Sequence, residues 1–489
     1  MRKDVVSLAI TLAARRLAVP TAATRALTFE DRVKATPASE RIMSLGGGTW
    51  AGIGGLTERF TTGRRAEKAA WTSYPLPPRG AENDAHAGRN VMKIIVSIAV
   101  SLIVSTSMLL AAEAAVLIVP EFGGKPAVAI TQGGYGLVWW DFRDAGTPGR
   151  PEGGLRFMPL DASGHPSGPD VPLEITDEYG LSTIYDVLKW THLEPVPGGF
   201  LLFAQEDGYE MDTLTLDRAG HPDGPSRQLL LSWELYPASV AARPGAIVMT
   251  YAEWYGTFQN WSQVVSPQGS AQGVRRPLAM SQIGGTGSGL YNRDSQVARS
   301  AEGFVAVWNQ YPIGIRLRDL TSNGQPMGDV ALIHPNACTR NVAVAAAGQT
   351  QAIVYSEGCA QTDVYLLLRD RDGIRGPLVL ADEPYNEGID LGYDAYHPLK
   401  VASTRSGFAV LYPVATPTPQ AGAHWIFLEF DASGSRIGPA RDLTVEFRFE
   451  AFEDLELVFD ERRGRYVVVW GGGGPEGYGL YLLALAPAP

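Results

Sequence analysis

The sequence predicts an all-β fold, a seven-bladed β-propeller over residues 115–489, from two repeated patterns and their period. The first pattern is a continuous apolar run that suits a strand buried on both faces. It occurs seven times: GYGLVWWD from Gly134, GFLLFAQE from Gly199, GAIVMTYAE from Gly245, GFVAVWNQY from Gly303, QAIVYSEG from Gln351, GFAVLYPV from Gly407 and RYVVVWGG from Arg465. The second is a glycine turn, spaced 49 to 61 residues apart, whose central residues are Gly164, Gly220, Gly269, Gly324, Gly373 and Gly434. A period of this size with four short strands per unit is typical of a β-propeller.

The unit from Gly303 to Gly328 shows how each repeat is built. After the apolar run, Ile313, Ile315 and Leu317 alternate with polar or small residues, as expected of a half-buried strand. The following segment, SNGQPMG at 322–328, has glycines that accept positive φ and polar residues that favour a tight reversal. We therefore predict that each apolar run is one strand of a hairpin.

The two ends of the propeller region predict how the ring closes. The last copy, from Arg465, ends without the glycine turn and outer strand of the other copies. Residues 115–120, AVLIVP, match residues 330–335, VALIHP, in pattern and in distance to the next strand. We therefore expect the N-terminal strand of the mature chain to complete the last blade, which would remove an exposed sheet edge.

Residues 1–114 differ from the repeats. Residues 1–91 hold 14 Lys and Arg against 8 Asp and Glu and show no repeat. From Met92, Lys93, an apolar core of 17 residues and a small-x-small sequence at 112–114 have the order of a cleaved signal peptide over 92–114. We interpret residues 1–91 as a non-domain upstream segment ahead of a true start at Met92. The alternative is a basic cytoplasmic extension before a membrane anchor.

The charge of residues 115–489 restricts the partners. This region carries a net charge of −17 when Lys, Arg, Asp and Glu are counted. Nucleic acids and anionic membranes both require a basic protein surface, so the composition disfavours them. We expect a secreted or periplasmic monomer that has no stable insertion in the membrane after signal cleavage.

Both repeated patterns resemble those of secreted bacterial β-propellers with a Gly-Phe-Val-Val-Val-Trp-like strand and an Asp-x-x-Gly-x-Pro-x-Gly-like turn. The turn is seen in DASGHPSG from Asp161 and DRAGHPDG from Asp217. The resemblance spans residues 115–489 and departs at Ser266 and Thr321, which replace the turn aspartate, and at the shortened turn near Gly373. It implies the propeller fold and no particular function, because both motifs belong to the scaffold.

The two cysteines, Cys338 and Cys359, flank a predicted hairpin whose turn falls at residues 348–349. In a symmetric hairpin they face each other, which predicts a cross-strand disulfide in an exported protein. A buried pair of free thiols is the alternative. Two cysteines alone do not make a metal site.

The binding site is expected on the face formed by the loops between blades and the loops after the buried strands. These loops vary in length, whereas the glycine turns on the other face are uniform. Aromatic rings that stack on sugars and carboxylates that bind hydroxyls together make a glycan site. The predicted ligand-binding residues, around one mouth of the channel, are Trp254, Tyr291, Arg293, Asp294, Asp390, Tyr393, Asp394 and Tyr396. Packing between blades is the alternative for any one of these rings.

Catalysis and metal binding have weaker support. Paired carboxylates could hydrolyse a glycosidic bond, with Glu253, Asp294, Asp390 and Asp394 as candidates. The chain has no Gly-x-Ser-x-Gly elbow, His-Glu-x-x-His motif or phosphate loop, and its histidines lack metal-ligand spacing. The acidic loop over 382–394 offers oxygen ligands for calcium, but we favour a solvated loop and expect no cofactor.

Two functions are consistent with these patterns. We expect an exported, non-catalytic propeller that binds a glycan or protein partner through the loop-rich face at the central channel. The alternative is a carbohydrate-active hydrolase or lyase that uses paired carboxylates on the same face.

Overall fold

The computed structural model describes residues 114–120, 124–141, 154–175, 188–206, 210–232, 235–236, 238–254, 258–279, 291–358, 363–380, 399–415 and 423–488. Within these ranges the backbone alone is described at 188–189, 206, 254, 258, 291–294, 340, 415, 423 and 450–454. The predicted upstream segment 1–91 and the predicted signal peptide 92–114 lie outside the described residues, apart from Ala114.

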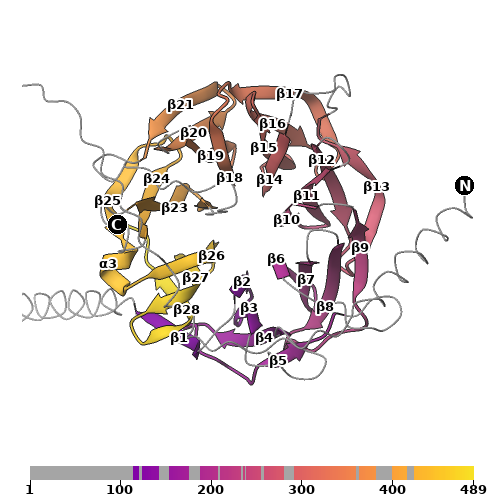
Figure 1. Cartoon of the computed structure of the whole chain (residues 1–489), viewed down its shortest axis with the longest axis vertical. Helices are drawn as coiled ribbons and strands as arrows, with labels where there is room; N and C mark the ends of the chain where they lie inside the picture. Colours follow the sequence, from indigo (N-terminus) through magenta and orange to yellow (C-terminus); the bar gives the residue numbers. More distant parts are fainter. Residues whose placement is uncertain are drawn as a thin grey trace, which may run out of the picture. The chain divides into compact units, whose positions relative to one another are not determined.

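Seven antiparallel sheets of four strands each form a ring, and each sheet is one blade (Figure 1). Blade 1 contains β2 (Gly124–Ile130), β3 (Gly134–Asp141), β4 (Gly154–Asp161) and β5 (Val171–Leu173). Blade 2 contains β6 (Leu188–Val196), β7 (Gly199–Glu206), β8 (Glu210–Asp217) and β9 (Arg227–Leu231). Blade 3 contains β10 (Ser239–Arg243), β11 (Ala246–Trp254), β12 (Phe258–Val265) and β13 (Ala271–Pro277). The strand order within each of these sheets follows the sequence, with the first strand nearest the centre.

Blades 4 to 6 have the same strand order. The seven four-stranded sheets confirm the predicted seven-bladed fold. Blade 4 contains β14 (Tyr291–Arg299), β15 (Phe304–Tyr311), β16 (Gly314–Leu320) and β17 (Pro326–His334). Blade 5 contains β18 (Thr339–Ala347), β19 (Thr350–Glu357), β20 (Asp363–Asp370) and β21 (Gly373–Val379). Blade 6 contains β22 (Lys400–Ser403), β23 (Gly407–Ala415), β24 (Ala423–Asp431) and β25 (Arg436–Asp442). The short helix α3 (Leu443–Phe447), with Asp442 as its N-cap, leads from β25 to blade 7.

Blade 7 combines the two ends of the propeller region. It contains β26 (Glu450–Asp460), β27 (Arg465–Gly474), β28 (Gly477–Leu485) and, as its outermost strand, β1 (Ala115–Pro120). β1 pairs antiparallel with β28, with Ala115 opposite Leu483 and Pro120 opposite Gly479. A second link joins blade 7 to blade 1, because the Tyr135 hydroxyl donates a hydrogen bond to Asp460 Oδ2 at 3.0 Å.

The seven apolar runs found in the sequence form the second strand of every blade, and they explain the core. In β15, Phe304 and Trp308 pack against blade 3, whereas Val305 and Val307 pack against blade 5. Alternate residues of a strand point to opposite faces, so a strand between two neighbouring sheets must be apolar throughout. Among the described residues, the buried apolar side chains form seven clusters of this kind, one at each junction between blades.

The glycine turns hold neighbouring blades together. Five turn glycines have φ between 72° and 90°, and a Cβ on any of them would lie within 2.7 Å of a side chain of the preceding blade; they are Gly164, Gly220, Gly269, Gly324 and Gly434. Four of these turns also accept hydrogen bonds from the blade that they touch, at the carbonyls of Ala162, Gly269, Gly324 and Ser433. Thr213 Oγ1 donates to the Gly269 carbonyl at 2.8 Å, and Ser262 Oγ donates to the Gly324 carbonyl at 3.4 Å. A glycine is therefore required both by the backbone conformation and by the close approach.

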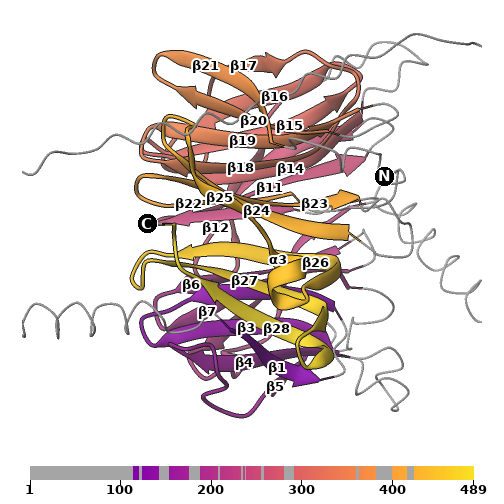
Figure 2. The same ribbon diagram turned by 90° about the vertical axis from the view of Figure 1, so that its left-hand side faces the viewer.

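The strands run between two different faces of the ring (Figure 2). The turn face is the end where the five docking glycines lie. The loop face is the opposite end, where the inner strands begin and the second strands end. Its connections range from the short one between His334 and Thr339 to the long one between Val379 and Lys400. This difference in regularity agrees with the predicted division into a scaffold face and a loop-rich face.

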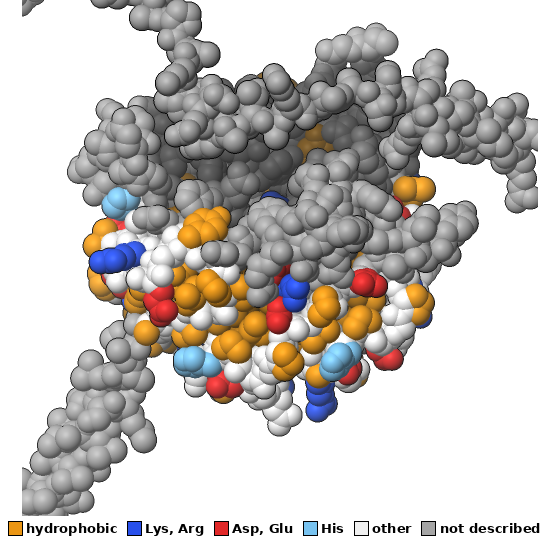
Figure 3. All heavy atoms as spheres, turned by 60° about the horizontal axis from the view of Figure 1, so that its bottom comes forward, with side chains coloured by type: hydrophobic (Ala, Val, Ile, Leu, Met, Phe, Trp, Pro, Cys, Tyr) orange, Lys and Arg blue, Asp and Glu red, His pale blue; other side chains and the backbone are white. Residues whose placement is uncertain are grey.

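The outer wall near blade 1 mixes acidic, basic, histidine and apolar side chains (Figure 3). Apolar side chains on outer strands include Val274, Ile374 and Val379, each at least 47% exposed. Across the described ranges, no helix has the length and apolar character needed to span a membrane.

Candidate functional site

The backbone places four of the predicted ligand-binding residues on two adjacent blades. Trp254 is the last residue of β11, where it pairs with Phe258. Tyr291, Arg293 and Asp294 lie at the start of β14, the inner strand of blade 4. β11 and β14 pack against each other, and both of these strand ends belong to the loop face. The structure describes only the backbone of these four residues, so the convergence of their side chains on one ligand stays a prediction.

The other four predicted residues, Asp390, Tyr393, Asp394 and Tyr396, lie outside the described residues. The same holds for the acidic loop 382–394, whose oxygen atoms are the candidate calcium ligands. Of the four carboxylates considered for catalysis, only Glu253 has a described side chain.

Glu253 is part of a buried group at the loop-face end of blade 3. Its side chain is 1% exposed, and its Oε2 lies 2.6 Å from Nη1 of Arg275 on β13. The Arg275 guanidinium also stacks over the ring of Trp261, 4.4 Å from the ring centroid. Burial opposes the charged form of Arg275, but its hydrogen bonds to Tyr251 and Glu253 prevail and raise its pKa above the usual value. Glu253 is therefore held in an ion pair that ties β11 to β13.

The position of Glu253 recurs in other blades. Asp141, Glu206, Glu253 and Glu357 stand at the loop-face ends of the second strands of blades 1, 2, 3 and 5. Asp141 Oδ2 lies 3.3 Å from Nε of Arg156 on β4 and accepts a hydrogen bond from Trp139. Asp141 and Glu253 therefore belong to the scaffold, where each binds the second strand of its blade to a strand outside it. The sequence contained a signal for these strand-end acids, because three of the quoted apolar runs end in Asp or Glu.

Glu357 differs from the other strand-end acids because its described partners come from blade 4. Its Oε2 lies 2.6 Å from His334 Nε2, and its Oε1 accepts a hydrogen bond from Asn336. The His334 ring packs on Tyr355, with ring centroids 4.9 Å apart. Burial, with the nearby Glu357 carboxylate, raises the pKa of Tyr355, so this ring remains a neutral phenol. Sequence reasoning missed this cluster because its members come from two blades.

The strand register around Cys338 corrects the predicted symmetric hairpin. Near the turn, Ala347 pairs with Thr350, and this register would bring position 338 opposite 359. A bulge at Asn341, where φ is 37°, shifts the register by one residue. The Cys338 carbonyl therefore accepts a hydrogen bond from the Gly358 amide at 3.1 Å. Cys359 lies outside the described residues, and the disulfide stays a prediction.

The fold places the chain among seven-bladed β-propellers, and comparison with known proteins adds no closer family. No protein-family model matches the chain, and no curated protein matches it. Among solved structures, the BP39L lectin from Burkholderia pseudomallei is similar at 12% identity and a TM-score of 0.46, over 76% of this chain and 98% of the lectin. A puromycin hydrolase is similar at 15% identity and a TM-score of 0.44, over 72% of this chain and 51% of the hydrolase. The Dos1 propeller is similar at 11% identity and a TM-score of 0.41, over 74% of this chain and 79% of that chain.

Proposed function

We propose that this protein is an exported, non-catalytic β-propeller that binds a glycan or protein partner through its loop face. The observation that carries the proposal is the difference between the two ends of the blades. On the turn face, the turn glycines pack against the neighbouring blade and so have a structural role. On the loop face, the connections differ in length, and the ends of β11 and β14 lie on two strands that pack against each other. The scaffold does not require these loops to have equal lengths, and binding residues are usually found in variable loops of this kind.

The partners of three described carboxylates at strand ends favour binding over hydrolysis. A glycosidase needs two carboxyl groups that are free to exchange protons or attack a sugar. Glu253 instead holds a guanidinium at 2.6 Å in a buried site, and Asp141 and Glu357 have scaffold partners of their own. The carbohydrate-active alternative would therefore depend on Asp294, Asp390 and Asp394.

Two assays on the purified full chain separate these functions. We expect retention of specific glycans or of a partner protein on an array, with no release of reducing ends from a panel of polysaccharides. Trp254→Ala and Tyr396→Ala should abolish the binding while leaving the unfolding midpoint nearly unchanged. Release of reducing ends that is lost in Asp394→Asn would establish the hydrolase instead. Binding that survives both aromatic replacements would contradict the loop-face assignment.

Export and the disulfide form one further part of the proposal. Cys338 and Cys359 are the two cysteines of the chain, and export would place them in an oxidising environment that favours a disulfide between them. We expect no thiol labelling in unreduced, unfolded protein recovered from the periplasm or medium. Labelling of both cysteines under these conditions would refute the disulfide.

A further inference from the structure

Blade 5 departs from the glycine turn that blades 1, 2, 3, 4 and 6 use to dock on their neighbours. Its strands β20 and β21 are joined by Arg371 and Asp372 alone, with Asp370 paired directly with Gly373. A Cβ on Gly373 would meet nothing within 4 Å, unlike the five docking glycines. Gly373 therefore does not dock on blade 4 as the five turn glycines dock on their neighbouring blades.

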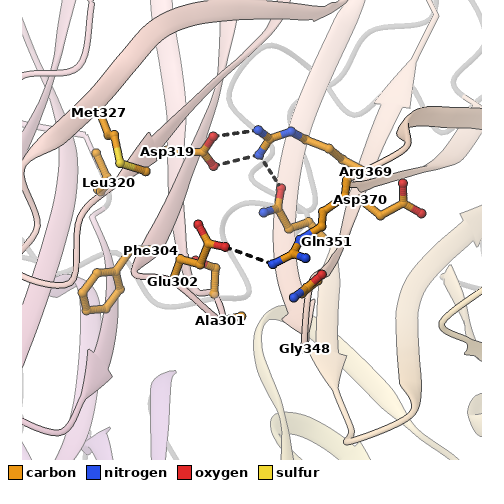
Figure 4. Close-up of a pocket in the computed structure, with 13 residues that line it drawn as sticks. Ala301, Glu302, Phe304, Asp319, Leu320, Met327, Gly348, Gln351, Arg369 and Asp370 are labelled. Carbon is orange, nitrogen blue, oxygen red and sulfur yellow. Dashed lines mark hydrogen bonds and ion pairs between the residues drawn. The ribbon is translucent and has the colours of Figure 1, made fainter.

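An arginine side chain makes this contact instead. Arg369 of blade 5 donates to both carboxylate oxygens of Asp319 in blade 4, at 2.7 and 2.6 Å, and to Gln351 Oε1 at 2.8 Å (Figure 4). Asp319 stands two residues before the turn, at the position of Val264 in blade 3, where the docked Gly324 packs. A charged pair thus replaces an apolar contact at one junction of the ring.

The missing turn leaves a cavity of about 160 Å³ on the turn face, between blades 4 and 5. Figure 4 shows its lining from both blades, with Glu302 and Met327 on one side and Gln351 and Arg369 on the other. Met327 is 43% exposed and presents an apolar surface beside these polar groups. The cavity is smaller than the roughly 300–1,000 Å³ of pockets for drug-sized ligands, so it suits a single small ring.

The charges around the cavity cancel in pairs. Besides Arg369 with Asp319, Arg371 lies 3.4 Å from Glu302. Asp370 is paired with Arg375 at 2.7 Å. An ionic ligand would meet both signs of charge, whereas a neutral ligand with several hydroxyls finds carboxylate acceptors and guanidinium donors together. The side chain of Met327 can contact the C–H face of such a ring.

We propose that this inter-blade cavity is a second ligand site, which binds one neutral sugar ring on the turn face. It is distinct from the loop-face site and does not depend on it. The walls belong to scaffold elements of blades 4 and 5.

Ligand-observed NMR on the full chain tests the proposal, with methyl glycosides of glucose, galactose, mannose and fucose as probes. We expect at least one probe to bind. Ala301→Trp, at an exposed turn residue that lines the cavity, should fill its mouth and weaken that binding roughly tenfold or more. Arg405→Trp is the matched control, because Arg405 occupies the corresponding exposed turn position of blade 6. It should leave binding unchanged.

A second variant restores the missing turn. Replacing Arg371 and Asp372 with the Ala-Ser-Gly-Ser sequence of residues 432–435 should place a docking turn over the cavity and abolish binding of the probe. Trp254→Ala should leave it unchanged, which separates this site from the loop face. Absence of binding by every probe, or equal loss in Ala301→Trp and Arg405→Trp, would overturn the proposal. Binding of a cyclic peptide with the blade 6 turn sequence, without any glycoside binding, would also overturn it, because the site would then receive a protein loop.

Discussion

Replacing Gly220 with alanine should weaken the junction between blades 1 and 2. Gly220 has a φ of 90°, and a Cβ on it would overlap the ring of Phe157. The positive φ costs a non-glycine residue about 1–2 kcal/mol. Forcing a methyl group into a packed contact costs about 1–3 kcal/mol more. We therefore expect a loss of roughly 2–5 kcal/mol in the free energy of unfolding.

Gly245 provides the matched control for this substitution. Its φ of 89° is almost the same, but nothing lies within 4 Å of its Cβ position. Gly245→Ala should therefore cost only the strain of the positive φ. Replacing glycine with alanine also lowers the conformational entropy of the unfolded chain, and this effect is common to both variants. Urea unfolding followed by tryptophan fluorescence would measure the two losses in parallel. Equal losses would refute the argument that the turn glycines are required for docking between blades.

Three other substitutions test the scaffold and its charges. Trp308→Ala should cost about 3–5 kcal/mol by urea unfolding, because the ring is fully buried between blades 3 and 4. Arg275→Met should cost up to about 3 kcal/mol, since it leaves buried Glu253 without its cation, and adding Glu253→Gln should recover part of this; no recovery would contradict the ion-pair assignment. Burial opposes ionisation of Asp460, but hydrogen bonds from Arg463 and Tyr135 prevail and hold its pKa below the usual value. Its ionised form stabilises the fold above the unfolded pKa of about 3.9, and this contribution is lost as the pH falls through the folded pKa. The destabilisation by Asp460→Asn, large at pH 7, should therefore shrink below about pH 4, and a constant difference in urea midpoints would contradict it.

The repeat in the sequence was sufficient to predict the architecture. The runs from Gly134 to Arg465 predicted the second strand of every blade, because a strand between two sheets has no face for water. The spacing of the turn glycines predicted the period of the repeat. Glycine recurs at this position because a positive φ and a close contact with the neighbouring blade both exclude other residues. The match between residues 115–120 and 330–335 predicted the strand that completes the last blade.

The roles of single side chains were decided only by the tertiary structure. Glu253 resembled a catalytic carboxylate in the sequence, and the distance to Arg275, a residue of another strand, shows that it is held in an ion pair. A bulge at Asn341 shifted Cys338 by one register position, which residue counting along a hairpin does not reveal. The shortened turn at Gly373 was visible in the sequence, but the cavity beside it depends on side chains of blade 4. Periodic sequence patterns reveal the features that every blade shares, because each repeat packs against its neighbours in the same way. Contacts between different blades join residues far apart in the chain, and no local pattern records them.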